Sequence, residues 1–97
     1  MNLEELRNYR SSIVSLAKKR HIDNIRIFGS VAKNQEHKKS DIDFLIHMKK
    51  EADLLDLSGF KLDLEELIGT PVDVIPDNSI HHLLKKQILS EAVRLDE

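Results

Sequence analysis

The spacing of apolar residues along the 97-residue chain predicts three helices and three strands. Apolar residues recur at helical intervals in three segments, namely 3–20, 54–68 and 80–92. Shorter apolar runs with the character of strands occupy 24–28, 41–47 and 72–75. The order helix, strand, strand, helix, strand, helix is typical of a small sheet covered by helices, in an α+β or α/β domain.

Local signals mark where several of these elements begin and end. Asn2 is a good N-cap for the first helix, and Glu5 completes a capping box. Gly69-Thr70-Pro71 ends the second helix, and Ser79 is predicted to cap the third. The segment 93–95 could continue the last helix or form a short edge strand, and the sequence does not decide between the two.

Composition excludes several classes of protein. The chain has no cysteine, which rules out disulfides, thiolate metal sites and a cysteine nucleophile. A net charge of −2 and 4% aromatic residues argue against direct binding of nucleic acid, which needs basic surface and stacking rings. No apolar run approaches the roughly 20 residues that span a bilayer, and the N-terminus resembles no signal peptide. We therefore expect one cytoplasmic domain over residues 1–97, with no membrane association.

Three aspartates carry the strongest chemical signal. Asp41 and Asp43 alternate with apolar residues in a predicted strand, so both carboxylates face one side, about 6.6 Å of backbone apart. Asp73 lies between Val72 and Val74 in the next predicted strand, and pairing of the two strands would bring the three carboxylates together. Because like charges repel, such a group calls for a cation, and its all-oxygen donors favour Mg²⁺ or Mn²⁺.

A second signal precedes the aspartates. Gly29 and Ser30 follow a predicted strand, where the backbone N–H groups of a tight turn can bind an anion, and Lys33 adds a positive charge. Taken singly, a Gly-Ser pair is usually an ordinary turn and an Asp-x-Asp pair is usually solvated charge. The order and spacing of all these features together indicate a phosphate-binding turn that faces a metal site.

The same residues resemble the signature of a known family. Phe28-Gly29-Ser30, Ala32-Lys33, Ser40-Asp41-Ile42-Asp43 and Val72-Asp73-Val74-Ile75 are similar to the motifs of minimal nucleotidyltransferases (MNT domains) of the DNA polymerase beta-like superfamily. The resemblance covers essentially the whole chain and implies an α+β fold, with a small mixed sheet flanked by helices. Asn34 departs from the pattern, since the family commonly has glycine there, and Asn tolerates a positive φ better than most residues.

The resemblance also implies a role for each motif residue. Asp41 and Asp43 would bind two Mg²⁺ ions, and Asp73 would complete the metal site and activate the acceptor hydroxyl. Gly29 and Ser30 would hold the nucleotide triphosphate, with Ser30 on the terminal phosphates. Lys33 occupies a place that the family often fills with Arg or Lys.

The resemblance further implies a partner. Stand-alone MNT proteins are commonly encoded beside a HEPN-domain toxin, and they neutralise it by transferring AMP from ATP to a toxin tyrosine, by binding it, or by both. The expected function is therefore Mg²⁺-dependent transfer of AMP to a HEPN-type toxin in a hetero-oligomer. The alternative is a binding module that masks the toxin without catalysis.

Two further features are left open by the sequence. A partner surface is expected on the outer faces of the segments 3–20 and 80–92, where four leucines fall partly off the core stripe: Leu3, Leu16, Leu89 and Leu95. Core packing is the commoner use of such residues. His81 and His82 are adjacent in a predicted helix and therefore point in different directions, so the pair is not expected to chelate a metal.

Overall fold

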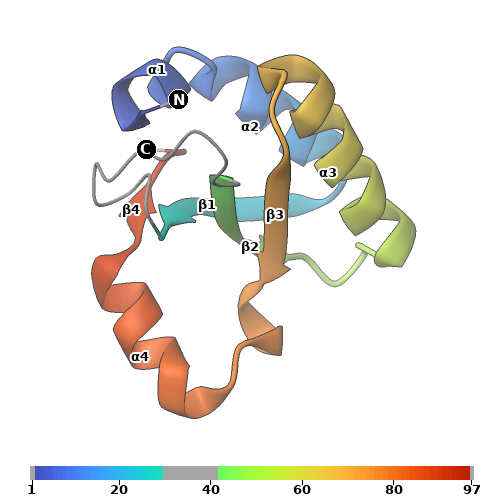
Figure 1. The fold of residues 1–97 in the computed structure, drawn as a ribbon. Coiled ribbons are helices and arrows are strands. Elements are labelled where there is room, and N and C mark those ends of the chain that lie inside the picture. The colour runs from blue at the N-terminus through green and yellow to red at the C-terminus, as the bar shows by residue number, and fades with distance from the viewer. Residues whose placement is uncertain (1, 30–41, 97) are drawn as a thin grey trace.

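The computed structural model describes residues 2–29 and 42–96, and Figure 1 shows their arrangement. The first stretch contains two helices and a strand, namely α1 (Leu3–Arg7), α2 (Arg10–Lys19) and β1 (Ile22–Phe28). The second contains β2 (Ile42–Met48), α3 (Leu54–Ile68), β3 (Val72–Pro76), the 3-10 turn η1 (Asp77–Ser79), α4 (His82–Glu91) and β4 (Val93–Arg94). In these two stretches, no helix is both long enough and apolar enough to cross a lipid bilayer.

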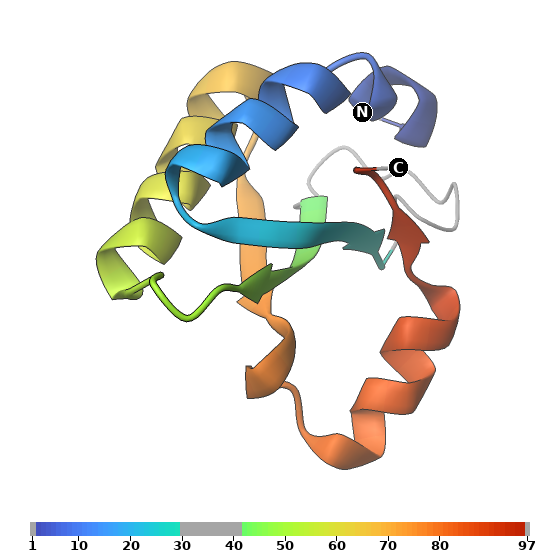
Figure 2. The ribbon, with the colours of Figure 1, turned by 180° about the vertical axis from the view of Figure 1, so that it is seen from behind.

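The four strands form one mixed sheet in the order β3-β2-β1-β4. The strand β2 pairs parallel with β3 and antiparallel with β1, and β4 pairs antiparallel with the other edge of β1. Helices α2 and α3 cover one face of this sheet (Figure 2), whereas α4 extends away from it (Figure 1). The α+β fold with a small mixed sheet, as predicted, is confirmed.

The core lies between the sheet and the helices α2 and α3. Ile42, Phe44 and Ile46 alternate along β2 and are at most 2% exposed, so the predicted apolar face of this strand does enter the core. Phe60 and Leu64 of α3 are fully buried against it. The sheet face that carries Asp43 therefore points away from this core.

Helix α3 has the bounds that the sequence predicts. It begins after a capping box in which the Asp56 N–H donates to Asp53 Oδ1 at 2.9 Å and the Asp53 N–H donates to Asp56 Oδ2 at 3.1 Å. It ends at Gly69, whose φ of +79° is a left-handed cap that glycine adopts without a steric penalty. Both ends are set by residues next to the helix in sequence, which explains why they were predictable.

The predicted continuous helix over 3–20 is wrong, because the chain bends between α1 and α2. Asn2 caps α1 as predicted, with its Oδ1 accepting from the Glu5 N–H at 2.8 Å. At the bend, Asn8 and Tyr9 donate to carbonyls only three residues back, a tight turn that interrupts the α-helical ladder. Tyr9 packs against the core from this bend, a tertiary contact that the local spacing does not reveal.

The predicted Ser79 cap is also wrong. Ser79 ends the turn η1, where its hydroxyl donates to the Pro76 carbonyl at 2.9 Å. Helix α4 begins at His82, and the ring of His81 caps it by accepting from the Leu83 N–H at 3.2 Å. The chain then forms the edge strand β4, which decides the question that the sequence left open.

The C-terminal residues are tied to β1, and this gives a pH-dependent contribution to stability. The Leu95 N–H donates to the Ile25 carbonyl at 2.9 Å, and Arg94 Nε donates to Asp96 Oδ1 at 2.8 Å. Burial raises the pKa of Asp96, but hydrogen bonds from Arg94 and the Ile25 backbone, together with the Arg94 charge, outweigh burial and lower it below the ordinary value. Ionised Asp96 therefore stabilises the fold above the unfolded-state pKa of about 3.9.

We expect this stabilisation to be lost as the pH falls from about 4 through the lower pKa of the folded state. The free energy of unfolding of the wild type should then fall more steeply with acid than that of Asp96→Asn, which cannot titrate. Urea unfolding at a series of pH values between about 5 and 2.5 measures both slopes. Equal slopes for the two proteins would show that Asp96 contributes nothing to the acid response.

Candidate functional site

Two carboxylates come together on the sheet face opposite the helices. Asp43 of β2 and Asp73 of β3 are register partners in parallel neighbouring strands, which run about 4.8 Å apart. The preceding register pair, Ile42 and Val72, is 2% and 1% exposed and enters the core. Because side chains alternate along a strand, Asp43 and Asp73 face the opposite side, where Asp43 is partly buried and Asp73 is exposed.

Gly29 lies against the Asp43 carboxylate at the end of β1. Its neighbour Phe28 is the register partner of Asp43, and Gly29 itself has a φ of +76°, a conformation that favours glycine. A Cβ atom placed on Gly29 would collide with Asp43 Oδ2 and lie 3.4 Å from Asp43 Cγ. The backbone of the turn therefore approaches the carboxylate as closely as only a residue without a side chain permits.

The other sequence-predicted site residues, Ser30, Lys33 and Asp41, lie outside the described residues. Within residues 2–29 and 42–96, there is no group of three or more His, Cys, Asp or Glu side chains that could hold a metal ion. The described part of the predicted metal site is the pair Asp43 and Asp73. Their carboxylate oxygens are the donors that Mg²⁺ prefers, so this pair fits a magnesium ion that takes its other ligands elsewhere.

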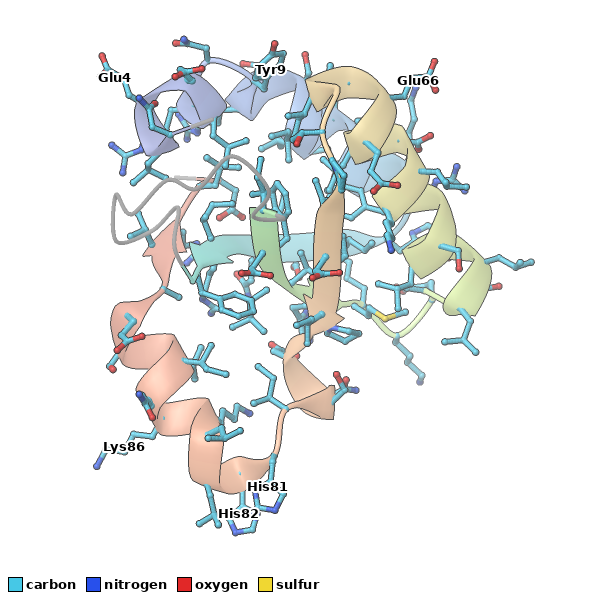
Figure 3. The ribbon with its side chains drawn as sticks, viewed as in Figure 1. Glu4, Tyr9, Glu66, His81, His82 and Lys86 are labelled. Carbon is cyan, nitrogen blue, oxygen red and sulfur yellow. The ribbon has the colours of Figure 1, made fainter. Side chains whose placement is uncertain are left out.

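Three of the described histidines make contacts away from the carboxylates. His47 Nδ1 and Asp23 Oδ1 are 2.7 Å apart across β1 and β2, at the end of β2 remote from Asp43. His81 and His82 lie at the start of α4, where Figure 3 shows them far from the sheet, and their rings stack with centroids 4.6 Å apart. His81 Nδ1 accepts from the Leu83 backbone N–H and so caps the helix. The expectation that the two histidines point in different directions is wrong, because His81 precedes the helix and its ring stacks on that of His82.

Sequence reasoning missed one residue on the carboxylate face. Arg26 of β1 is opposite Leu45 of β2 in register, and Leu45 shares its strand face with Asp43. The signal in the sequence is that Arg26 stands as a single charged residue between two isoleucines, Ile25 and Ile27. Both isoleucines are buried in the structure, so Arg26 lies on the face away from the core. Arg26 is therefore a near neighbour of Asp43 on this face, although the motif does not include it.

A sequence model of a protein family, described as "Nucleotidyltransferase domain", matches residues 4–95. The chain belongs to the nucleotidyltransferase domain family. A protein of Methanocaldococcus jannaschii named "Putative protein adenylyltransferase MJ0435" is 43% identical over 93 residues, which are 96% of this chain and 97% of that protein. The resemblance to minimal nucleotidyltransferases seen in the sequence is thereby confirmed.

Solved structures agree on the fold of this nucleotidyltransferase. A structure described as "Structure of putative minimal nucleotidyltransferase" superposes with a TM-score of 0.89 at 37% identity, covering 98% of this chain and 97% of that one. A toxin-antitoxin structure with AMP-PNP gives a TM-score of 0.74 at 22% identity, covering 89% of this chain and 71% of that one.

A third structure, of a tri-AMPylated Shewanella oneidensis HEPN toxin in complex with MNT antitoxin, gives a TM-score of 0.67 at 19% identity, covering 96% of this chain and 71% of that one. At this identity, and at that of the AMP-PNP structure, the likeness is one of fold.

Proposed function

We propose that this nucleotidyltransferase transfers AMP from ATP to a tyrosine hydroxyl of a HEPN-type toxin and thereby acts as its antitoxin. The observation that carries the proposal is the register pair Asp43 and Asp73, with the Gly29 backbone directly against Asp43. The relative with 43% identity over nearly the whole chain bears the name of a protein adenylyltransferase. One fold relative was solved with AMP-PNP and another with an AMPylated HEPN toxin.

The chain's own residues suit this reaction. The turn at Gly29 and Ser30 would hold the triphosphate, with Lys33 nearby, and Asp41, Asp43 and Asp73 would hold two Mg²⁺ ions. When bound, Mg²⁺ stabilises negative charge on phosphoryl oxygens. The acceptor oxygen forms a bond to the α-phosphorus, the bond from that phosphorus to the bridging oxygen breaks, and pyrophosphate leaves. Asp73 is more exposed than Asp43, and it takes the proton of the acceptor hydroxyl.

A partner surface is available on α4. No residue of this helix is buried, and Leu83 and Leu84 are 73% and 54% exposed. Of the four leucines that the sequence offered for a partner surface, Leu89 of α4 is 37% exposed, but Leu95 is 2% exposed and belongs to the core. Leu3 and Leu16 are partly buried against that core, so of these four leucines only Leu89 of α4 remains exposed for a partner. Exposed leucines on one helix favour contact with another protein.

The same surface supports the alternative function, a module that neutralises the toxin by masking it. The two functions differ in what happens to the toxin's mass. We expect a HEPN-type toxin used as the acceptor to gain one or more AMP units after incubation with this protein, ATP and Mg²⁺, as measured by intact-mass spectrometry. The Leu83→Asp/Leu84→Asp variant should lose both the complex and the mass gain, because a charged face opposes docking.

Each outcome decides between the functions. A stable complex without any mass gain would exclude the transferase proposal and support masking. A mass gain by the wild type that the Leu83→Asp/Leu84→Asp variant retains in full would exclude α4 as the docking surface. Lys61→Gln, on the exposed part of α3, is the control for a surface change elsewhere.

A further inference from the structure

Arg26 and Asp43 are diagonal neighbours on one face of the sheet. Phe28 pairs with Asp43 and Arg26 pairs with Leu45, so Arg26 lies two residues from the partner of Asp43. Diagonal positions in an antiparallel pair are about 7–8 Å apart, within reach of long side chains. The alternation of β1, in which Ile25 and Ile27 are at most 1% exposed, directs Arg26 to the carboxylate side of the sheet.

The guanidinium of Arg26 has a buried nitrogen that has no hydrogen-bond partner among residues 2–29 and 42–96. Its Nη1 atom is shielded from solvent and donates no hydrogen bond to any described residue. The residue on its other side in register is Arg94 of β4, a second cation whose Nε donates to Asp96 and whose Nη2 donates to Asn24. A guanidinium keeps its charge, and a buried charged donor that lacks an acceptor is unfavourable. This nitrogen is therefore suited to an anion that arrives from outside the protein.

We propose that Arg26 binds a phosphate oxygen of the nucleotide, an inference that rests on the proposed nucleotidyl transfer. Asp43 is its diagonal neighbour on β2, and Asp73 lies one strand further on, so a nucleotide whose phosphates approach Asp43 comes within reach of Arg26. The planar fork of a guanidinium matches phosphate geometry, and hydrogen bonds between ionised groups are stronger than neutral ones. Arg26 thus adds a positive group from β1 to a site otherwise built from carboxylates and a glycine turn.

The proposal predicts opposite effects of Arg26→Met on stability and on binding. Without nucleotide, this variant should melt at the same temperature as the wild type or higher, because it removes a buried unpaired donor. Its affinity for AMP-PNP in the presence of Mg²⁺, measured by titration calorimetry, should fall by about 10- to 100-fold, whereas its affinity for adenosine, measured by competition, should stay unchanged. Arg26→Lys keeps the positive charge but not the planar, forked guanidinium. Its affinity for AMP-PNP should lie between those of the wild type and Arg26→Met.

Arg20→Met is the matched control. Arg20 Nη2 lies 3.3 Å from Asp63 Oδ2 on the helical side of the molecule, so this variant should melt at a lower temperature and bind AMP-PNP normally. Unchanged AMP-PNP affinity in Arg26→Met would overturn the inference and leave the proposed function intact. An equal loss for AMP-PNP and adenosine with a lower melting temperature would also overturn it, because Arg26 would then only support the fold. A wild type that does not bind AMP-PNP would overturn the proposed function itself, and this inference with it.

Discussion

Asp43→Asn should lower the rate of AMP transfer by a factor on the order of 10³, because a carboxylate that holds a catalytic cation is worth several kcal/mol in the transition state. Asp43 and Asp73 are direct register partners, and like charges facing one another across strands cost about 0.2–1 kcal/mol. Loss of activity together with loss of the Mg²⁺-induced rise in melting temperature distinguishes a functional carboxylate from a structural one.

Three measurements check this prediction. The first is the transfer rate, taken from the intact mass of the acceptor over time. The other two are the melting temperatures of the wild type and of Asp43→Asn, measured with Mg²⁺ and without it. Mg²⁺ should raise the melting temperature of the wild type and have little effect on Asp43→Asn, since a ligand stabilises only a state that binds it. Glu66→Gln is the charge-matched control, at an exposed position on α3 that is labelled in Figure 3. Its transfer rate and the effect of Mg²⁺ on its melting temperature should equal those of the wild type. A transfer rate in Asp43→Asn within threefold of the wild type would exclude Asp43 from the site.

The corresponding change at Asp73 tests a separate role. If Asp73 takes the proton of the acceptor hydroxyl, Asp73→Asn should lower the transfer rate as Asp41→Asn does. Unchanged transfer in Asp73→Asn, together with abolished transfer in Asp41→Asn, would assign the proton to a different group.

Gly29→Ala should lower the transfer rate by about 100-fold, with a smaller effect on folding, because misplacing a catalytic group by about 1 Å has that effect. The methyl group would collide with Asp43 Oδ2, so the carboxylate must move. The positive φ of +76° adds strain of about 1–2 kcal/mol for any residue with a Cβ. Transfer assays and urea unfolding measure the two effects separately.

The chain offers a matched control for this strain in Gly69, the C-cap of α3. Gly69 has nearly the same φ, +79°, but a Cβ there would meet no atom within 4 Å. Gly69→Ala should therefore lose a similar free energy of unfolding, about 1–2 kcal/mol, and keep the wild-type transfer rate. Equal activity in the two variants would show that contact between Gly29 and Asp43 has no catalytic consequence.

Several features of the fold could be predicted because they depend on neighbours in sequence. The bounds of α3 follow from its apolar spacing and from Gly69, and the alternation of β2 correctly separates the face of Phe44 from the face of Asp43. Where local signals compete with tertiary contacts, prediction failed. The bend before α2 brings Tyr9 against the core, and Ser79 is used by η1 although its residue type suits a helix cap.

The candidate site divides in the same way. The sequence by itself determined which residue types are available, namely the aspartates, the Gly29-Ser30 turn and the absence of cysteine, and their order suffices to identify the family. Only the tertiary structure decided that β2 and β3 are parallel neighbours with Asp43 opposite Asp73, because strand register depends on pairing between segments far apart in the chain. It alone also revealed that Arg26 lies on the face of Asp43 with a buried nitrogen that has no hydrogen-bond partner in the described part of the chain. Burial and hydrogen bonding are properties of the packed molecule, which the spacing of residues along one strand does not determine.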